Sequence, residues 1–87
     1  MAKYSIRIKK SARKELESIA TKADRLRIIK RIQSLADNPR PMGSQKLSGF
    51  GRYRIRQGNY RIVYSIQDAK LVVYVIRIGD RKDVYRH

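Results

Sequence analysis

The chain contains no cysteine and no tryptophan, and its single histidine, His87, is the last residue of the sequence. Without cysteine there can be neither a disulfide nor a thiolate metal ligand, and one histidine cannot build a zinc site alone. Because a terminal residue is usually frayed, we do not expect His87 to act as a general base. These absences exclude zinc chemistry based on Cys and His and predict a protein without a metal or other cofactor.

Acidic residues are also scarce: 7 Asp and Glu stand against 22 Lys and Arg, which gives a formal net charge of +15 at pH 7 on 87 residues. A field of this sign attracts nucleic acid, an acidic protein or an anionic membrane surface. No apolar run approaches the roughly 20 residues of a membrane-spanning helix. Lys3, Arg7, Lys9 and Lys10 lie where a signal peptide has its apolar core. We therefore expect a cytoplasmic protein with an anionic partner and no membrane contact.

The most informative segment covers residues 53–64, in which two stretches of alternating polarity flank a Gly-Asn pair at 58–59. Gly at the first central position of a two-residue loop is typical of a type II′ turn and predicts a β-hairpin. The predicted pairs are Gln57–Tyr60, Arg56–Arg61, Ile55–Ile62, Arg54–Val63 and Tyr53–Tyr64. Arg54, Arg56 and Arg61 then share one face. Like charges opposite each other destabilise a sheet, so this face predicts a polyanionic ligand, most simply a phosphate.

Hydrophobic periodicity predicts a strand and two helices in the first half of the chain. Residues 3–8 alternate in polarity, as a half-buried strand does. Helical spacing predicts one helix capped by Ser11 and a second that begins after Thr21 and is stopped by the Asn-Pro pair at 38–39. Their apolar stripes are Ala12, Leu16 and Ile19 in the first helix, and Leu26, Ile29, Ile32, Leu35 and Ala36 in the second. Both stripes are expected to face the core of a helical hairpin.

The residue pattern in the second half of the chain predicts strands. A loop over residues 38–51 is expected to hold a short turn or strand end around Lys46-Leu47, and a third apolar run over residues 71–76 follows the hairpin. Continuous apolarity predicts a central strand covered on both faces. The elements together predict one α+β domain over residues 1–87, with an N-terminal strand, a helical hairpin and a three-strand antiparallel meander. The helices would cover one face of the sheet and leave the other open and basic.

Three further residues are candidates for the basic face. Arg81 and Tyr85 come directly after the third strand of the meander, and Lys46 precedes the hairpin. Arg81 has the alternative of pairing with a neighbouring aspartate, and Tyr85 that of packing against the edge of the core. Beside an arginine cluster, however, an aromatic ring that can stack on a base points to RNA. Lys46 is either a phosphate contact or an ordinary loop charge.

The chain resembles toxins of the RelE/ParE superfamily, small bacterial proteins that are encoded with an antitoxin. The resemblance extends from residue 4 to residue 85, and its motifs are Tyr-Arg-Ile-Arg at 53–56, Tyr-Arg-Ile-Val-Tyr at 60–64 and Ile-Gly-Asp-Arg at 78–81. RelE-type members cleave mRNA in the ribosomal A site, whereas ParE-type members poison DNA gyrase. The resemblance implies the RelE-like fold, a ribosome and mRNA as targets, and an antitoxin that wraps and neutralises the toxin in a hetero-oligomer.

Carried over residue by residue, the resemblance implies attack by a ribose 2′-hydroxyl on the adjacent phosphate. The candidate site has catalytic residues Arg61, Arg81 and Tyr85 and substrate-binding residues Arg54, Arg56 and Lys46. Where relatives carry lysines, Arg54 and Arg56 stand here, and a guanidinium with a pKa above about 12 is a poor general base. These two arginines are expected to hold the phosphate instead. Proton removal is left to Tyr85, to a ribosomal group or to solvent.

Two rival functions stay open at this point. A ParE-like gyrase poison would act by binding protein and would need no chemistry of its own. A non-catalytic RNA-binding protein would bind with a salt dependence set by its phosphate contacts and would never cut. The combination of Arg81 and Tyr85 favours the nuclease, because simple charge attraction does not require the tyrosine.

Overall fold

Five strands form one mixed sheet in the part of the chain that this computed structural model describes, residues 3–47 and 51–80. In chain order the elements are β1 (Ser5–Ile8), α1 (Lys10–Glu17), α2 (Lys22–Ser34), β2 (Gln45–Lys46), β3 (Arg52–Gln57), β4 (Tyr60–Gln67), the short 3₁₀ helix η1 (Asp68–Lys70) and β5 (Val72–Asp80). The strand order is β1-β5-β4-β3-β2, with β1 parallel to β5 and the other neighbours antiparallel.

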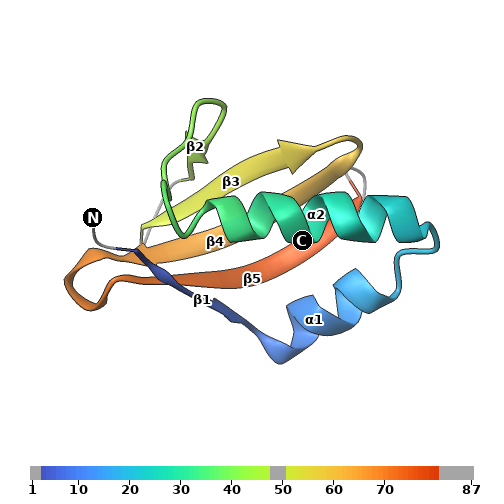
Figure 1. The fold of residues 1–87 in the computed structure, drawn as a ribbon, viewed down its shortest axis with the longest axis horizontal. Helices are drawn as coiled ribbons and strands as arrows, with labels where there is room; N and C mark the ends of the chain where they lie inside the picture. Colours follow the sequence, from blue (N-terminus) through green and yellow to red (C-terminus); the bar gives the residue numbers. More distant parts are fainter. Residues whose placement is uncertain (1–2, 48–50, 81–87) are drawn as a thin grey trace.

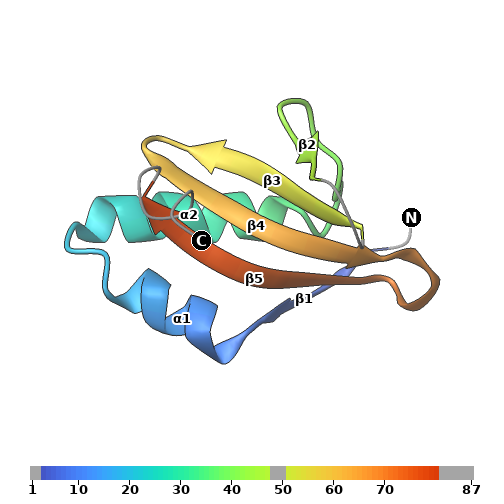
Figure 2. The same ribbon diagram turned by 180° about the vertical axis from the view of Figure 1, so that it is seen from behind.

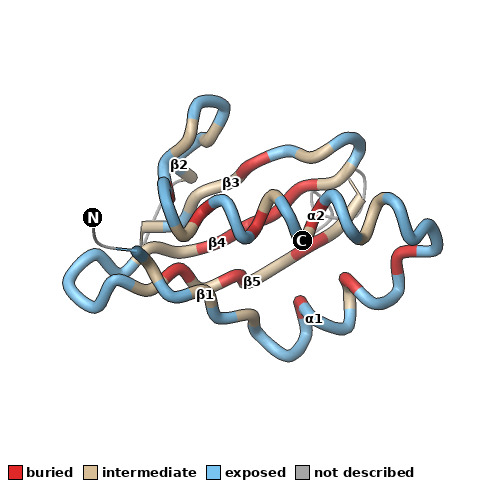
Figure 3. The backbone as a smooth tube through the Cα atoms, viewed as in Figure 1, coloured by how far each residue is buried: buried red, intermediate tan, exposed pale blue. Residues whose placement is uncertain are grey.

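The helices cover one side of this sheet. In Figure 1 α2 lies in front of the strands, and in Figure 2, seen from behind, β3, β4 and β5 lie in front of α2. The buried side chains between the two layers form one core, coloured red along the tube in Figure 3. They are Ala12, Leu16, Ile19, Ile28, Ile32 and Leu35 from the helical segment, and Ile55, Ile62, Tyr64, Val73, Val75 and Ile78 from the sheet. The α+β fold with helices on one face is therefore confirmed.

The first strand lies at an edge of the sheet beside β5, a placement that the sequence does not indicate. The N–H of Lys9 still donates to the carbonyl of Val75 at 2.9 Å, so pairing continues to the last residue before α1. A parallel neighbour needs a crossover connection, and here the two helices begin it. The predicted alternation is confirmed, since the half-buried residues are Tyr4, Ile6 and Ile8.

The predicted Ser11 cap is wrong. The first helix begins at Lys10, the capping position is Lys9, and no side chain caps this end. The reason is that α1 follows β1 without a loop, so the extended backbone of Lys9 serves both the strand and the helix start. Thr21 does occupy the capping position of α2, as predicted, but its side chain makes no capping hydrogen bond.

The predicted stripe of the second helix is confirmed at Ile32 and Leu35 and is wrong at Leu26, while Ile28, which was not predicted, joins the core. Ile28, Ile32 and Leu35 are buried, whereas Leu26 is 54% exposed and Ile29 is only partly buried. Apolar residues in α2 fill two adjacent stripes, and either would satisfy helical periodicity. Packing against α1 and the sheet selects the stripe that contains Ile28, so the assignment of Leu26 to the core was wrong.

The hairpin matches the sequence prediction pair by pair. All five predicted pairs occur, including Arg56 opposite Arg61. Gly58 has a φ of 61°, and among described non-glycine residues only Leu71 has a positive φ, so Asn59 does not. A positive φ at the first central position and a negative one at the second define the predicted type II′ turn. Of the turn or strand end expected around Lys46-Leu47, the structure shows a strand, β2.

The last strand is longer than the predicted run over residues 71–76 and is not covered on both faces. The middle strand of the sheet is β4, while β5 lies between it and β1. Val73, Val75 and Ile78 are buried, but the residues between them are only partly buried. Ile76 is the extra residue of a register shift against β4, as in a β-bulge. The prediction of two covered faces was wrong because Val72 and Tyr74 face the side without helices.

Candidate functional site

Among the described residues, six arginines share the face of the sheet that the helices leave uncovered. Residues opposite each other on neighbouring strands point to the same face. Arg56 is opposite Arg61, and Arg54 is opposite Val63, which in turn is opposite Arg77. We call the six together the arginine face: Arg7, Arg52, Arg54, Arg56, Arg61 and Arg77. The predicted clustering of three arginines is therefore present, and three more extend it.

Arg61 is the most enclosed of these side chains, with 2% of its surface exposed, whereas Arg56 opposite it is exposed. Charged side chains are rarely buried to this degree without compensation. Arg56 and Arg61 line a small cavity of about 60 Å³ together with Gly58 and Asn59 of the hairpin turn. Around a buried guanidinium the effective dielectric is low, so its attraction for an anion is stronger than at an exposed site. The arrangement suits a compact anion such as a phosphate group.

The neighbouring strand β2 positions a second guanidinium. Gln45 is in register with Arg54, and the Arg54 Nη2 donates a hydrogen bond to the Gln45 Oε1. Arg54 is partly buried, so both packing and this bond restrict its rotamers. A donor that is held in place before the ligand arrives loses less conformational entropy on binding. The two-residue strand thus contributes to the site although it is far from the core.

A carboxylate from α1 contacts β5 beside Arg77 of the arginine face. Glu15 accepts a hydrogen bond from the N–H of Ile78 at 3.1 Å and lies 3.8 Å from Nε of Arg77. The pairing of β1 with β5 ends at Val75, so later backbone donors on that edge need another acceptor. Glu15 supplies one and fixes α1 to the edge of the sheet.

Comparison with known proteins identifies the family and the fold of this chain. The model of a family described as ParE toxin of type II toxin-antitoxin system, parDE, matches residues 6–85. This chain belongs to the RelE/ParE family of toxins. A protein of Escherichia coli described as a RelE-like toxin is 30% identical over 95% of this chain and 90% of its own length. The mRNA interferase toxin RelE of E. coli K12 is 33% identical over 70% of this chain and 68% of its own length.

A solved structure shows the same architecture in a toxin–antitoxin assembly. One chain in the crystal structure of the archaeal RelE–RelB complex from Pyrococcus horikoshii OT3 superimposes on this RelE/ParE-family toxin with a TM-score of 0.82 and 30% sequence identity. The match covers 98% of this chain and 99% of that one. The five-stranded sheet and the two helices are therefore the RelE fold.

The residues predicted for the site of this RelE/ParE-family toxin do not all lie together. Arg54, Arg56 and Arg61 lie together, as described above. Lys46 is in register with Tyr53, whose ring stacks on the buried Tyr64 at 5.9 Å between centroids. Lys46 therefore points to the helix-covered side, away from the arginine face. The predicted residues Arg81 and Tyr85, like His87, lie outside the described residues, and their roles stay predictions.

Sequence reasoning missed two residues that contact the predicted site. Gln45 faces Arg54 because β2 pairs with β3 in this register, and a polar loop residue gave no signal of that. Arg77 joins the arginine face because the irregularity at Ile76 changes which residues of β5 face the uncovered side. Strict alternation from Val73 would instead have pointed residue 77 toward the core. Only an alternating pattern interrupted by one residue could have indicated the bulge.

An ion pair in this RelE/ParE-family toxin holds the loop before β2. Arg40 contacts Asp68 at 2.8 Å and donates from Nε to the Tyr53 hydroxyl at 3.1 Å. Tyr4 donates to the same carboxylate at 2.6 Å. Hydrogen bonds from Arg40 and then from Tyr4 lower the pKa of Asp68 to about 2. The network joins the N-terminal strand, the loop, β3 and η1.

A buried tyrosine fastens the start of the same loop. The Tyr64 hydroxyl donates to the carbonyl oxygen of Pro39 at 2.7 Å, and burial raises the pKa of this hydroxyl to about 12. Because the phenol stays protonated at every physiological pH, the hydrogen bond persists. The loop between α2 and β2 is thus anchored at both Pro39 and Arg40, which sets the position from which Gln45 reaches Arg54.

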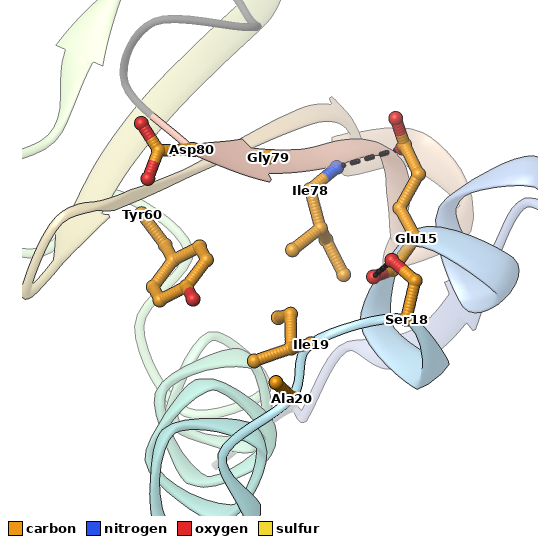
Figure 4. Close-up of a pocket in the computed structure, with 8 residues that line it drawn as sticks. All are labelled: Glu15, Ser18, Ile19, Ala20, Tyr60, Ile78, Gly79 and Asp80. Atoms are coloured by element: carbon orange, nitrogen blue, oxygen red, sulfur yellow. Dashed lines mark hydrogen bonds between the residues drawn. The ribbon is translucent and has the colours of Figure 1, made fainter.

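A larger cavity lies on the helix side of the sheet (Figure 4). It has a volume of about 320 Å³ and lies between the end of α1, the start of β4 and the end of β5. Its lining residues are Glu15, Ser18, Ile19, Ala20, Tyr60, Ile78, Gly79 and Asp80. Two carboxylates at its wall disfavour a phosphate, and Asp80, in register with Tyr60, does not share the arginine face. This cavity adjoins the candidate anion site at Tyr60, which lines both, but it lies on the other side of the sheet.

The described ranges contain neither a cluster of metal ligands nor a membrane-spanning helix. Residues 3–47 and 51–80 bring together no group of three or more metal-ligating His, Cys, Asp or Glu side chains. Neither α1 nor α2, the helices in these ranges, has the length and apolarity to cross a membrane.

Proposed function

We propose that this RelE/ParE-family toxin is a ribosome-dependent endoribonuclease that cleaves mRNA in the ribosomal A site. The observation that carries the proposal is the buried Arg61 opposite Arg56 on a sheet face of six arginines. Like charges opposite each other destabilise a sheet, and an anion that binds beside them relieves this repulsion. An E. coli relative is an mRNA interferase, which supports RNA as the anion.

The proposed reaction is an internal transfer at the scissile phosphate. The 2′-hydroxyl oxygen attacks phosphorus and loses its proton, the bond to the 5′ oxygen breaks, and that oxygen takes a proton. Arg61 and Arg81 would stabilise the charge that develops on the phosphoryl oxygens, while Arg54 and Arg56 position the group. Tyr85 would orient the nucleotide by stacking or take part in proton transfer. Lys46, on the other side of the sheet, would contact only RNA phosphates beyond the reacting group.

The natural partners in this proposal are the ribosome with its mRNA and a cognate antitoxin, all in the cytoplasm. The related Pyrococcus protein was solved as a RelE–RelB complex. A chain with a formal charge of +15 and an uncovered basic sheet face would attract an acidic or amphipathic antitoxin segment. Such a segment would neutralise the toxin by covering or distorting the arginine face in a hetero-oligomer.

The test adds purified toxin to ribosomes halted on a defined mRNA and maps the new 5′ ends by primer extension. Naked mRNA and the Arg56→Ala variant, which removes an exposed cation, are run in parallel. Cuts confined to the A-site codon and reduced by the substitution support the proposal. An uncut message on programmed ribosomes would reject it.

The alternative is a ParE-like gyrase poison, which the description of the matching family model favours. Its sign would be growth arrest with DNA damage while cellular mRNA stays intact. Induction of the toxin in cells, followed by parallel measurement of mRNA 5′ ends and of DNA breaks, separates the two functions.

A further inference from the structure

The arginine face continues well beyond the hairpin to a second cavity. This cavity has a volume of about 340 Å³ and is lined by Arg7, Gln67, Lys70, Val72 and Tyr74. Arg7 is in register with Tyr74, and Gln67 with Val72, so these four residues share the face that carries Arg61. None of the five is among the site residues predicted from the sequence.

The lining offers three kinds of contact at once. Arg7 and Lys70 are exposed cations that can bind phosphate oxygens. Tyr74 is partly buried, so its ring is held by packing and can still stack on a base. The amide of Gln67 has both donors and an acceptor for the polar edge of a base. A cation pair, an aromatic ring and an amide together fit a nucleotide better than they fit an isolated anion.

This cavity is too far from Arg61 to hold the same nucleotide. Ser65, which is opposite Tyr74, follows Arg61 by four residues along β4, which is roughly 13 Å at strand geometry. A further cavity of about 380 Å³ lies between this face and the start of α1, and it is lined by Arg52 and Arg77 together with Lys9, Ser11, Glu15 and Ile76. Arg52 pairs with Ser65, which pairs with Tyr74, so cationic residues occur in successive rows from the hairpin turn to β1.

We propose that Arg7, Lys70 and Tyr74 form a second subsite for single-stranded RNA, which binds a nucleotide upstream or downstream of the one held at Arg61. The inference rests on the proposed function, because it takes RNA as the ligand of the arginine face. Single-stranded RNA is favoured over a duplex because stacking on Tyr74 needs an unpaired base. It is favoured over an acidic polypeptide because a peptide gains little from a stacking ring and an amide placed among cations.

The experiment measures equilibrium binding of fluorescent RNA to the full chain in the absence of ribosomes. The probes are a short and a long single strand, of about four and about twelve nucleotides, both fully 2′-O-methylated so that no 2′-hydroxyl can attack. The variants are Tyr74→Ala, Tyr74→Phe and Arg7→Gln, with Arg13→Gln of α1 as a control that removes an equal charge elsewhere. Polyglutamate serves as the acidic polypeptide probe.

The expected result is that Tyr74→Ala weakens binding of the long strand about tenfold, whereas Tyr74→Phe keeps the ring and the affinity. Arg7→Gln should weaken the long strand more than Arg13→Gln does, and the short strand should respond little to any of these changes. Equal affinities of wild type and Tyr74→Ala for the long strand would overturn the subsite. So would an equal loss for polyglutamate, which would assign the surface to a polypeptide.

The RNA-binding experiment and the ribosome assay can fail independently of each other. If programmed ribosomes are not cut but the long strand loses affinity in Tyr74→Ala, the nuclease proposal fails and the subsite stands. If the message is cut but Tyr74→Ala binds as wild type does, the subsite fails and the nuclease proposal stands.

Discussion

At the scale of single residues, Arg56 and Arg61 differ in burial although they face each other across one strand pair. Arg56 is exposed, while 2% of Arg61 is exposed. An exposed cation attracts an anion weakly because water and salt screen it, whereas a buried one keeps most of its interaction. In the proposed reaction we therefore expect Arg61 to stabilise the transition state and Arg56 to position the phosphate.

The first prediction concerns the rate of cleavage. Arg61→Ala should lower the single-turnover rate on programmed ribosomes by about 10²–10³-fold, as the loss of one preorganised charge donor does in other enzymes. Arg61→Lys keeps the charge but loses the forked geometry, so it should recover only part of the rate. Arg13→Ala, on α1, is the control and should match wild type. Circular dichroism establishes that each variant is folded; a folded Arg61→Ala with the wild-type rate would refute the assignment.

The second prediction concerns Asp68 and pH. Its pKa is about 2 in the folded protein and 3.8 in the reference state, so the carboxylate stabilises the fold at pH values above about 4. This contribution should disappear as the pH falls from 3.8 toward 2. Urea midpoints of wild type and Asp68→Ala should differ at pH 6 and converge near pH 2. The difference should be small, because the partners Arg40 and Asp68 are both exposed. A difference that persists at pH 2 would contradict the linkage.

At the scale of elements, α2 shows how a helix selects one of two apolar stripes. Ile28, Ile32 and Leu35 face the core, whereas Leu26, which belongs to the other stripe, is 54% exposed. Periodicity alone accepts both stripes, because each repeats every three or four residues. The choice is made by the shape of the surface formed by α1 and the sheet, which sequence patterns do not contain.

The third prediction follows from this difference in burial. Ile28→Ala should lower the free energy of unfolding by about 2–4 kcal/mol, because it leaves a cavity at a side chain with no exposed surface. Leu26→Ala, the matched control on the same helix, should change it by less than about 0.5 kcal/mol. Urea denaturation at neutral pH gives both values. Equal losses would show that the helix packs through the stripe that contains Leu26.

At the scale of the whole molecule, the fold separates its charge from its core. The two helices cover the apolar face, and the six arginines remain on the other face within a total charge of +15. A field of this size steers anionic partners from a distance and depends on salt. The same face would receive RNA and a neutralising antitoxin, so the two are expected to compete.

The fourth prediction measures this field. Binding of 2′-O-methyl RNA should weaken as salt rises, with a logarithmic slope that reports the number of phosphate contacts. Arg56→Gln should reduce the slope by about one and weaken all sequences alike. Lys30→Gln, an exposed cation on α2, should leave the slope unchanged. A slope that falls equally in both variants would show that net charge, and not the arginine face, binds the RNA.

The sequence by itself determined the hairpin and its register, because the Gly-Asn turn and the period of two are local properties of residues 53–64. The same locality explains why the stripe of α1 and the start of α2 could be predicted. The tertiary structure alone decided that β1 pairs with β5, that Lys46 points away from Arg54, and that the bulge at Ile76 turns Arg77 toward the arginine face. These features depend on contacts between segments far apart in the chain, and their energies are set by packing that no local pattern records.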